Sequence, residues 1–128
     1  MSTDKNIFEY EGITVIVDPT DYECLERSEK AKEIINNALE ASKKIDSPVE
    51  STKLMFDEYS AALNLIVNDN SASEKVLGGT KSFRKICSVL TAYFEFFISI
   101  QNEISTEAKS LTDKYATNRE QRRNAAKK

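Results

Sequence analysis

Residues 89–100 read VLTAYFEFFISI and form the most apolar stretch of the chain. They are too few to span a membrane, which takes about 20 apolar residues, and Glu95 interrupts them. The stretch belongs to a run from Lys81 to Lys128 that contains no Gly or Pro. Apolar residues recur in this run every three or four positions, which predicts a long final helix, with a bend or split near residues 99–102 as an open alternative. These positions are Phe83, Ile86, Leu90, Tyr93, Phe97, Ile100, Ile104, Ala108, Leu111 and Tyr115.

The apolar side chains of residues 89–100 cover more than one face of that helix. One stripe is ordinarily core, but Phe94 and Ile98 lie on one side of it and Phe96 on another. This surplus needs a second layer to cover it. Either the helix is central in a bundle, or part of it is a protein–protein surface. We predict that the interaction residues of this stretch are Tyr93, Phe94, Phe96, Phe97 and Ile98.

Upstream of this helix, residues 6–17 combine β-branched and aromatic residues on both sides of Glu11-Gly12, which predicts a β-hairpin. A lone hairpin is marginal in water, so this one must pack on helices or pair with the edge of another chain. Asp18-Pro19 indicates the start of the first helix, with Asp18 as its N-cap. The residues expected on the inward stripe of that helix are Tyr22, Leu25, Ala31, Ile35, Ala38, Leu39 and Ile45.

Two further helices are expected before the final one. Ser47-x-x-Glu50, with Pro48 between, is typical of a capping box and predicts a helix that ends near Val67. Ser71-x-x-Glu74 opens a short helical turn, and Gly78-Gly79 ends it. The inward positions of the longer helix are Val49, Thr52, Phe56, Tyr59, Leu63 and Ile66.

The composition agrees with a helical domain, because 40% of the residues are hydrophobic and the chain has only three Gly and two Pro. We therefore expect a mainly α fold: a small N-terminal β-hairpin followed by a bundle of three to four helices with a long C-terminal helix. A single domain is expected over residues 1–117. The polar start of the chain, with no apolar segment after it, argues against a signal peptide and a membrane association.

The last residues form a basic tail. Residues 118–128 carry five basic side chains and one acidic one, whereas residues 1–117 carry 13 basic and 20 acidic ones. We expect a flexible tail, which is either a solvated terminus or a handle that offers Arg119, Arg122 and Arg123 to an acidic protein surface. Phosphate contacts with nucleic acid are an alternative. They are less favoured, because no aromatic residues that could stack on bases lie between the basic residues of the tail. The acidic residues 1–117 would also repel a polyanion.

The residue types present exclude much chemistry. The chain has no His, which removes His-based acid–base catalysis and most zinc and haem sites. Cys24 and Cys87 stand alone in the sequence, so two reduced thiols are favoured over a disulfide. Residues 78–81 lack the first glycine of a phosphate-binding loop. Glu95 either faces solvent or is a buried acid with a raised pKa. A catalytic acid needs partner residues, and the sequence around Glu95 offers no candidates for them. We predict no enzyme activity, no cofactor and no metal site.

The order of features resembles that of a known group of proteins. The hairpin sequence FEYEGITVIV is followed by DPTDYECLERSEKA, a VLGG stop, a helix with Cys87 and several Phe, and a closing YATNREQRRNAAKK. In this layout the chain is similar to the tail assembly chaperones of long-tailed bacteriophages and prophages of Gram-positive bacteria. The residues that match the closing N-R-x-Q-R-R segment of that group are Asn118, Arg119, Gln121, Arg122 and Arg123.

The resemblance implies a non-catalytic protein of the bacterial host cytoplasm. Such a chaperone binds the tape-measure protein, tail-tube subunits or both, and we expect it to form a homo-oligomer. The aromatic helix would then be the client-binding part. Two alternatives stay open: a minor virion component, such as a head–tail connector or tail completion protein, and a nucleic-acid-binding regulator that works through the basic tail.

Overall fold

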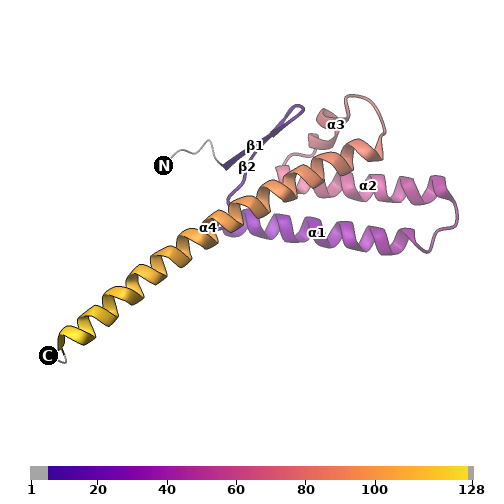
Figure 1. Ribbon diagram of the computed structural model, residues 1–128. Helices are drawn as coiled ribbons and strands as arrows, with labels where there is room; N and C mark the ends of the chain where they lie inside the picture. Colours follow the sequence, from indigo (N-terminus) through magenta and orange to yellow (C-terminus); the bar gives the residue numbers. More distant parts are fainter. Residues whose placement is uncertain (1–5, 127–128) are drawn as a thin grey trace.

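A computed structural model describes residues 6–126 of the chain, with side chains for residues 6–113 (Figure 1). The described part is mainly helical, with an N-terminal hairpin and a long last helix, which confirms the predicted fold class. The elements in chain order are β1 (Ile7–Tyr10), β2 (Ile13–Ile16), α1 (Tyr22–Ser42), α2 (Pro48–Val67), α3 (Ala72–Leu77) and α4 (Phe83–Ala126).

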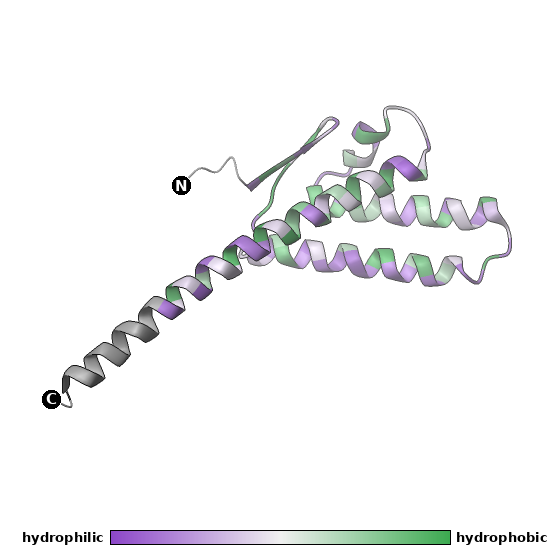
Figure 2. Cartoon of the chain, viewed as in Figure 1, coloured by the Kyte–Doolittle hydropathy of each residue, from purple (hydrophilic) through white to green (hydrophobic). Residues whose placement is uncertain are grey.

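The helices pack in two layers. Helices α1 and α2 lie side by side, and α4 crosses them at an angle, with α3 and the hairpin close to its first half (Figure 1). Figure 2 shows hydrophobic residues on the parts of α2, α4 and the hairpin that lie within the bundle. The side chains at the centre of the core come from α1, α2 and α4 and from the residue that directly follows β2: Val17, Ala31, Leu63, Ile86, Val89, Tyr93 and Phe97.

The hairpin packs on helices, which is one of the two arrangements that the sequence analysis left open. Strands β1 and β2 are antiparallel, with Phe8 opposite Val15 and Tyr10 opposite Ile13. One face of the hairpin is buried, whereas Ile16 on the other face is 72% exposed. The ring of Phe8 meets that of Tyr93 edge-on, at 5.7 Å between centroids. The hairpin therefore completes the core over α4.

The hairpin turn depends on Gly12. Glu11 and Gly12 form a two-residue loop in which both φ angles are positive, 29° and 91°, as in a type I′ turn. A Cβ added at Gly12 would lie 3.5 Å from the carbonyl oxygen of Lys75 in α3, which is ordinary contact. A side chain at this position is therefore unfavourable because of its φ and not because of crowding.

We expect Gly12→Ala to lower the free energy of unfolding by about 1 kcal/mol, because alanine is strained at this positive φ. Gly12→Asn should lose less, since asparagine tolerates positive φ better. Urea unfolding followed by circular dichroism measures both variants. An alanine variant as stable as the original chain would contradict this account of the turn.

Helix α1 begins later than predicted. The Asp18 carboxylate accepts a hydrogen bond from the backbone N–H of Thr20 at 2.9 Å, so it stabilises a turn that precedes the helix. The N-cap is Asp21, whose carboxylate accepts from the N–H groups of Glu23 and Cys24 at 2.9 and 3.1 Å. The prediction of Asp18 as the N-cap is wrong, because two aspartates three residues apart both offer a cap and the turn takes the first.

The buried stripe of α1 consists of small residues: Cys24, Ser28, Ala31, Ala38 and Ser42. The prediction that Tyr22 and Leu39 face inward is wrong, because they are 77% and 41% exposed. The inward stripe of α1 was predicted from apolar residues alone, so the buried serines Ser28 and Ser42 were left out of it. Their hydroxyls bond within the protein: that of Ser42 donates to the carbonyl oxygen of Leu39 at 2.7 Å.

Helix α2 ends as expected, but its first turn is more exposed than predicted. The hydroxyl of Ser47 accepts from the N–H of Glu50, and Pro48 occupies the first turn, which confirms this helix start. Asn68 ends the helix in a left-handed conformation. The prediction that Val49 faces inward is wrong, since it is 76% exposed.

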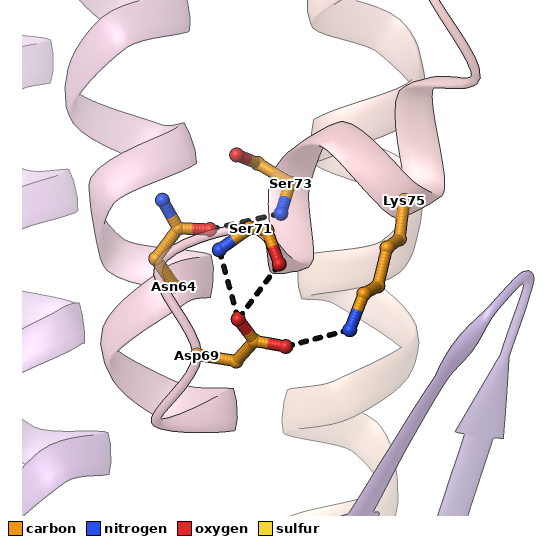
Figure 3. Close-up of polar contacts among 5 residues, drawn as sticks. All are labelled: Asn64, Asp69, Ser71, Ser73 and Lys75. Carbon is orange, nitrogen blue, oxygen red and sulfur yellow. Dashed lines mark hydrogen bonds and ion pairs between the residues drawn. The ribbon is translucent and has the colours of Figure 1, made fainter.

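A polar cluster holds α3 against the end of α2 (Figure 3). The side-chain oxygen of Asn64 in α2 accepts from the N–H of Ser73 at 2.8 Å, so α2 caps the start of α3. The Asp69 carboxylate accepts from the N–H and hydroxyl of Ser71 at 2.9 and 2.8 Å, and from the Lys75 ammonium at 2.7 Å. Helix α3 begins and ends where the sequence indicated, with Gly78 left-handed at its end, but Ser71 makes no side-chain cap bond.

The Lys75 ammonium and the two hydrogen bonds from Ser71 hold the pKa of Asp69 well below its ordinary value of 3.8. A lowered native-state pKa stabilises the fold above pH 3.8, and this contribution falls as the pH drops below that value. We therefore expect Asp69→Asn to be less stable than the original chain at pH 7. The difference should shrink at pH 3 in urea unfolding. A stability difference that stays constant between pH 7 and pH 3 would contradict this expectation.

Helix α4 is unbroken from Phe83 to Ala126, so it is not split near Ser99–Asn102. Its first half lies in the bundle, and its second half projects beyond it (Figure 1). Among the residues whose side chains are described, Ile104 is the last one that packs against the core. From Ser105 to Asp113 every described side chain is exposed. Residues 118–126 belong to this helix, and their flexibility stays a prediction.

Candidate protein-binding groove

A surface groove of about 450 Å³ lies beside the aromatic part of α4. Helix α4 lines it with one face, at positions 87, 91, 94 and 98, which step by four, three and four residues. This face lies next to the buried face of the same helix, which contains Tyr93 and Phe97. We call it the α1–α4 groove, and its residues are Lys32, Ile35, Asn36, Tyr59, Cys87, Leu90, Thr91, Phe94, Glu95 and Ile98.

Buried contacts between α1 and α4 hold the base of the α1–α4 groove. The hydroxyl groups of Ser28 in α1 and Tyr93 in α4 share a hydrogen bond of 2.8 Å. The Tyr93 ring meets the Phe94 ring edge-on at 5.3 Å between centroids. Burial raises the pKa of the Tyr93 hydroxyl to about 12, although the bond to Ser28 acts in the opposite direction. Tyr93 therefore stays neutral and serves to join the two helices.

Charged residues flank the apolar part of the groove. The Lys32 ammonium lies 5.5 Å from the ring centroid of Phe94 and 5.9 Å from that of Phe97, within the range of a cation–π contact. Lys32 and Glu95 are both exposed. Of the large apolar side chains, Ile98 is 48% exposed and Phe94 is half-buried. The groove thus combines an apolar strip with one basic and one acidic residue at its sides.

Two groups at the groove bear on its chemistry. Burial raises the pKa of the Cys87 thiol, which keeps it protonated and poorly nucleophilic at neutral pH. Burial, with the nearby Cys87, also raises the pKa of Tyr59. Glu95 is exposed, which confirms the solvent-facing alternative for this residue. Contact between apolar surfaces is the interaction that these residues support best.

The structure separates the five predicted interaction residues of α4. Tyr93 and Phe97 are each 1% exposed and belong to the core, so in this fold they support the surface instead of forming it. The Phe96 ring lies 5.7 Å from that of Phe8, under the hairpin. Phe94 and Ile98 are the two that line the α1–α4 groove. The helix is therefore both central in the bundle and part of a surface.

Other groove residues were not predicted as site residues. The sequence placed Ile35 and Tyr59 on inward stripes and gave no signal for Lys32 or Asn36. These residues come from α1 and α2, and only the packing of those helices against α4 brings them to Phe94 and Ile98. The second stripe on α4 was visible in the sequence as surplus apolar residues.

The remaining site predictions concern the basic tail. Arg119, Arg122 and Arg123 belong to helix α4, but the structure describes side chains only up to residue 113. The prediction for these three arginines therefore lies outside the described side chains. Within the described part of the chain, no three His, Cys, Asp or Glu residues gather as metal ligands would. Cys24 and Cys87 are not bonded to each other. Among the described helices, none combines the length and apolar character that crossing a membrane requires.

Comparison with known proteins places the chain in a family. Residues 11–126 match a family described as "Family of unknown function (DUF6673)". No curated protein and no solved structure matches the chain. The family match begins at the hairpin turn and includes all four helices of the described region, from the N-cap of α1 to the end of α4. The chain therefore belongs to DUF6673, a family of unknown function.

Proposed function

We propose that this protein is a non-enzymatic tail assembly chaperone of a long-tailed bacteriophage or prophage. In this proposal it binds an amphipathic helix of a client protein in the α1–α4 groove. The observation that carries the binding role is the groove itself, with Ile98 48% exposed beside a half-buried Phe94. The resemblance in sequence layout supports the choice of client, which is the tape-measure protein, the tail-tube protein or both.

The groove suits an amphipathic helix better than a polar ligand. A helix that lays its apolar face into a groove places side chains at positions i, i+3, i+4 and i+7 against apolar walls. Phe94, Ile98 and Ile35 offer such walls from two helices. Lys32 and Glu95 flank them and can pair with the charged residues that border the apolar face of a client helix.

A chaperone role follows from what such binding would do. A tape-measure protein is long and helical, and its apolar stripes aggregate when they are exposed. A small acidic partner that covers those stripes keeps the client apart from other copies until the tube assembles around it. This work takes place in the cytoplasm of the bacterial host, needs no cofactor and uses no reactive side chain.

Co-expression tests the proposal. The protein carries an affinity tag, and the tape-measure and tail-tube proteins encoded by neighbouring genes are expressed with it. We expect the tape-measure or tube protein to be retained with the tagged chain and to move from the insoluble to the soluble fraction. If neither protein is retained, or if the neighbouring genes encode no tail proteins, the proposal is wrong.

Purified virus particles provide a second readout. A chaperone should be absent from them by mass spectrometry, whereas a head–tail connector or completion protein would be present. Salt-dependent retention of the chain on DNA, lost on deletion of residues 118–128, would instead favour the nucleic-acid-binding alternative.

A further inference from the structure

Strand β1 turns the backbone groups of two residues away from its partner strand. The residues that flank the two-residue turn face each other across the hairpin, and such a pair exchanges both of its backbone hydrogen bonds. Bonded pairs of this kind alternate along the ladder with pairs that are not bonded to each other. The N–H of Val17 donates to the carbonyl oxygen of Asn6 at 2.6 Å, which agrees with this alternation. The N–H and C=O groups of Ile7 and Glu9 therefore point away from β2.

We call this side of the strand the β1 edge. Among the residues that the structure describes, no backbone or side-chain group bonds to the outward groups of Ile7 and Glu9, and the sheet has two strands. Strand β2 lies against α2 and α3, whereas β1 lies against α4. Unpaired N–H and C=O groups along a strand are a template for a further strand.

A hollow of about 470 Å³ lies at the β1 edge, lined by Ile7, Phe8, Glu9 and Phe96. The rings of Phe8 and Phe96 lie 5.7 Å apart on the side of the hairpin that faces the core. Glu9 points to the opposite face of the hairpin and is exposed. A strand added at the β1 edge would place alternate side chains in the hollow beside the two rings and on the outer face beside Glu9.

We propose that the β1 edge binds an extended segment of a partner protein, which adds an antiparallel third strand to the hairpin. The central residues of that segment are a basic residue opposite Glu9, an apolar residue opposite Phe8 and a β-branched residue opposite Ile7. The residues opposite Glu9 and Ile7 exchange backbone hydrogen bonds with β1. The basic side chain pairs with the Glu9 carboxylate across the strands, and the apolar side chain fills the hollow.

Charge selects a different protein over a second copy of this chain. Neither strand that a second copy could offer, IFEY or ITVI, contains a basic residue, so the exposed carboxylate of Glu9 would have no cationic partner. The strand site does not rest on the proposed chaperone function, because it lies at β1 and not in the α1–α4 groove.

Amide hydrogen exchange of the full-length chain alone, followed by NMR, tests whether the β1 edge is free. We expect the amides of Ile7 and Glu9 to exchange at least about tenfold faster than those of Phe8 and Tyr10, which bond to β2. Equal protection at low protein concentration would mean that the chain covers its own edge. Protection that grows with concentration would mean that a second copy covers it, and either result would overturn the proposal.

Titration with a synthetic peptide tests the binding itself. The probe is the acetylated and amidated peptide Thr-Thr-Lys-Leu-Val-Thr-Thr, which should slow the exchange of the Ile7 and Glu9 amides. A methyl group on the amide nitrogen of its Lys or its Val should weaken binding at least about tenfold, because both N–H groups face β1. The same group on its Leu, whose N–H points away, should change binding by less than about threefold. No binding at millimolar peptide, or equal effects of the three methyl groups, would overturn the proposal.

Variants of the chain test the same contacts from the other side. Ile7→Pro removes one outward N–H at the first residue of an edge strand, where proline is tolerated, and should weaken peptide binding about tenfold. The matched control is Ile7→Val, which keeps the N–H and should bind as the original chain does. Glu9→Lys should weaken binding about threefold and favour a peptide with Glu in place of its Lys. With circular dichroism showing folded variants, unchanged binding by Ile7→Pro or no change in charge preference would overturn the proposal.

Discussion

Phe97→Ala is expected to destabilise the protein by about 3–5 kcal/mol. Phe97 is 1% exposed, and its ring packs 6.1 Å from that of Tyr93 at the centre of the core. Truncation removes the buried ring and leaves a cavity that α1, α2 and α4 cannot close without moving. Small domains are stable by about 5–15 kcal/mol in total, so this one change removes a large share of the stability.

Thermal unfolding measured by circular dichroism gives the result directly, and a fall in the midpoint of about 15 °C is expected. The neighbouring Ile98→Ala variant is the matched control, because Ile98 is 48% exposed and should cost below about 1 kcal/mol. Phe97→Leu, with a smaller cavity, covers the case in which the alanine variant does not fold. Equal losses for Phe97→Ala and Ile98→Ala would contradict the division of α4 into a core face and a groove face.

Ile98→Glu should weaken client binding strongly while the fold is kept. The side chain is already half in water in the free protein, so a charged replacement is accommodated without loss of the core. In a complex the same position is covered by the client helix, and an unpaired carboxylate there is costly to desolvate. We expect at least a tenfold loss in affinity for the tape-measure or tube protein, which corresponds to about 1.4 kcal/mol or more.

The measurement is the co-expression capture described above, followed by titration of purified proteins. Leu39→Glu serves as the control, because Leu39 is 41% exposed on α1 but does not line the groove. It should capture the client as the original chain does. Equal capture by the two glutamate variants would show that the client binds elsewhere, and capture by neither would point to a general loss of binding competence.

Local sequence patterns predicted most of the fold because they act over a few residues. The two-residue turn at Glu11-Gly12, the Ser47 cap and the Gly78 stop each depend on neighbouring backbone groups, so the sequence was sufficient for them. The start of α1 was less certain, because Asp18 and Asp21 offer the same cap chemistry three residues apart. The predicted buried face of α1 was wrong for another reason. Ser28 becomes a core residue only because Tyr93 supplies its hydrogen-bond partner.

Residue patterns alone predict a helical protein with a hairpin, a long last helix and more apolar surface on that helix than one core face uses. How this surface is divided follows from the packing of the other elements against α4. The hairpin covers Phe96, the bundle buries Tyr93 and Phe97, and α1 stops short of covering Phe94 and Ile98. The period of a helix determines which residues share a face, whereas the exposure of that face depends on which distant elements pack there. Pairs such as Ser28 and Tyr93, 65 residues apart, have no local signature.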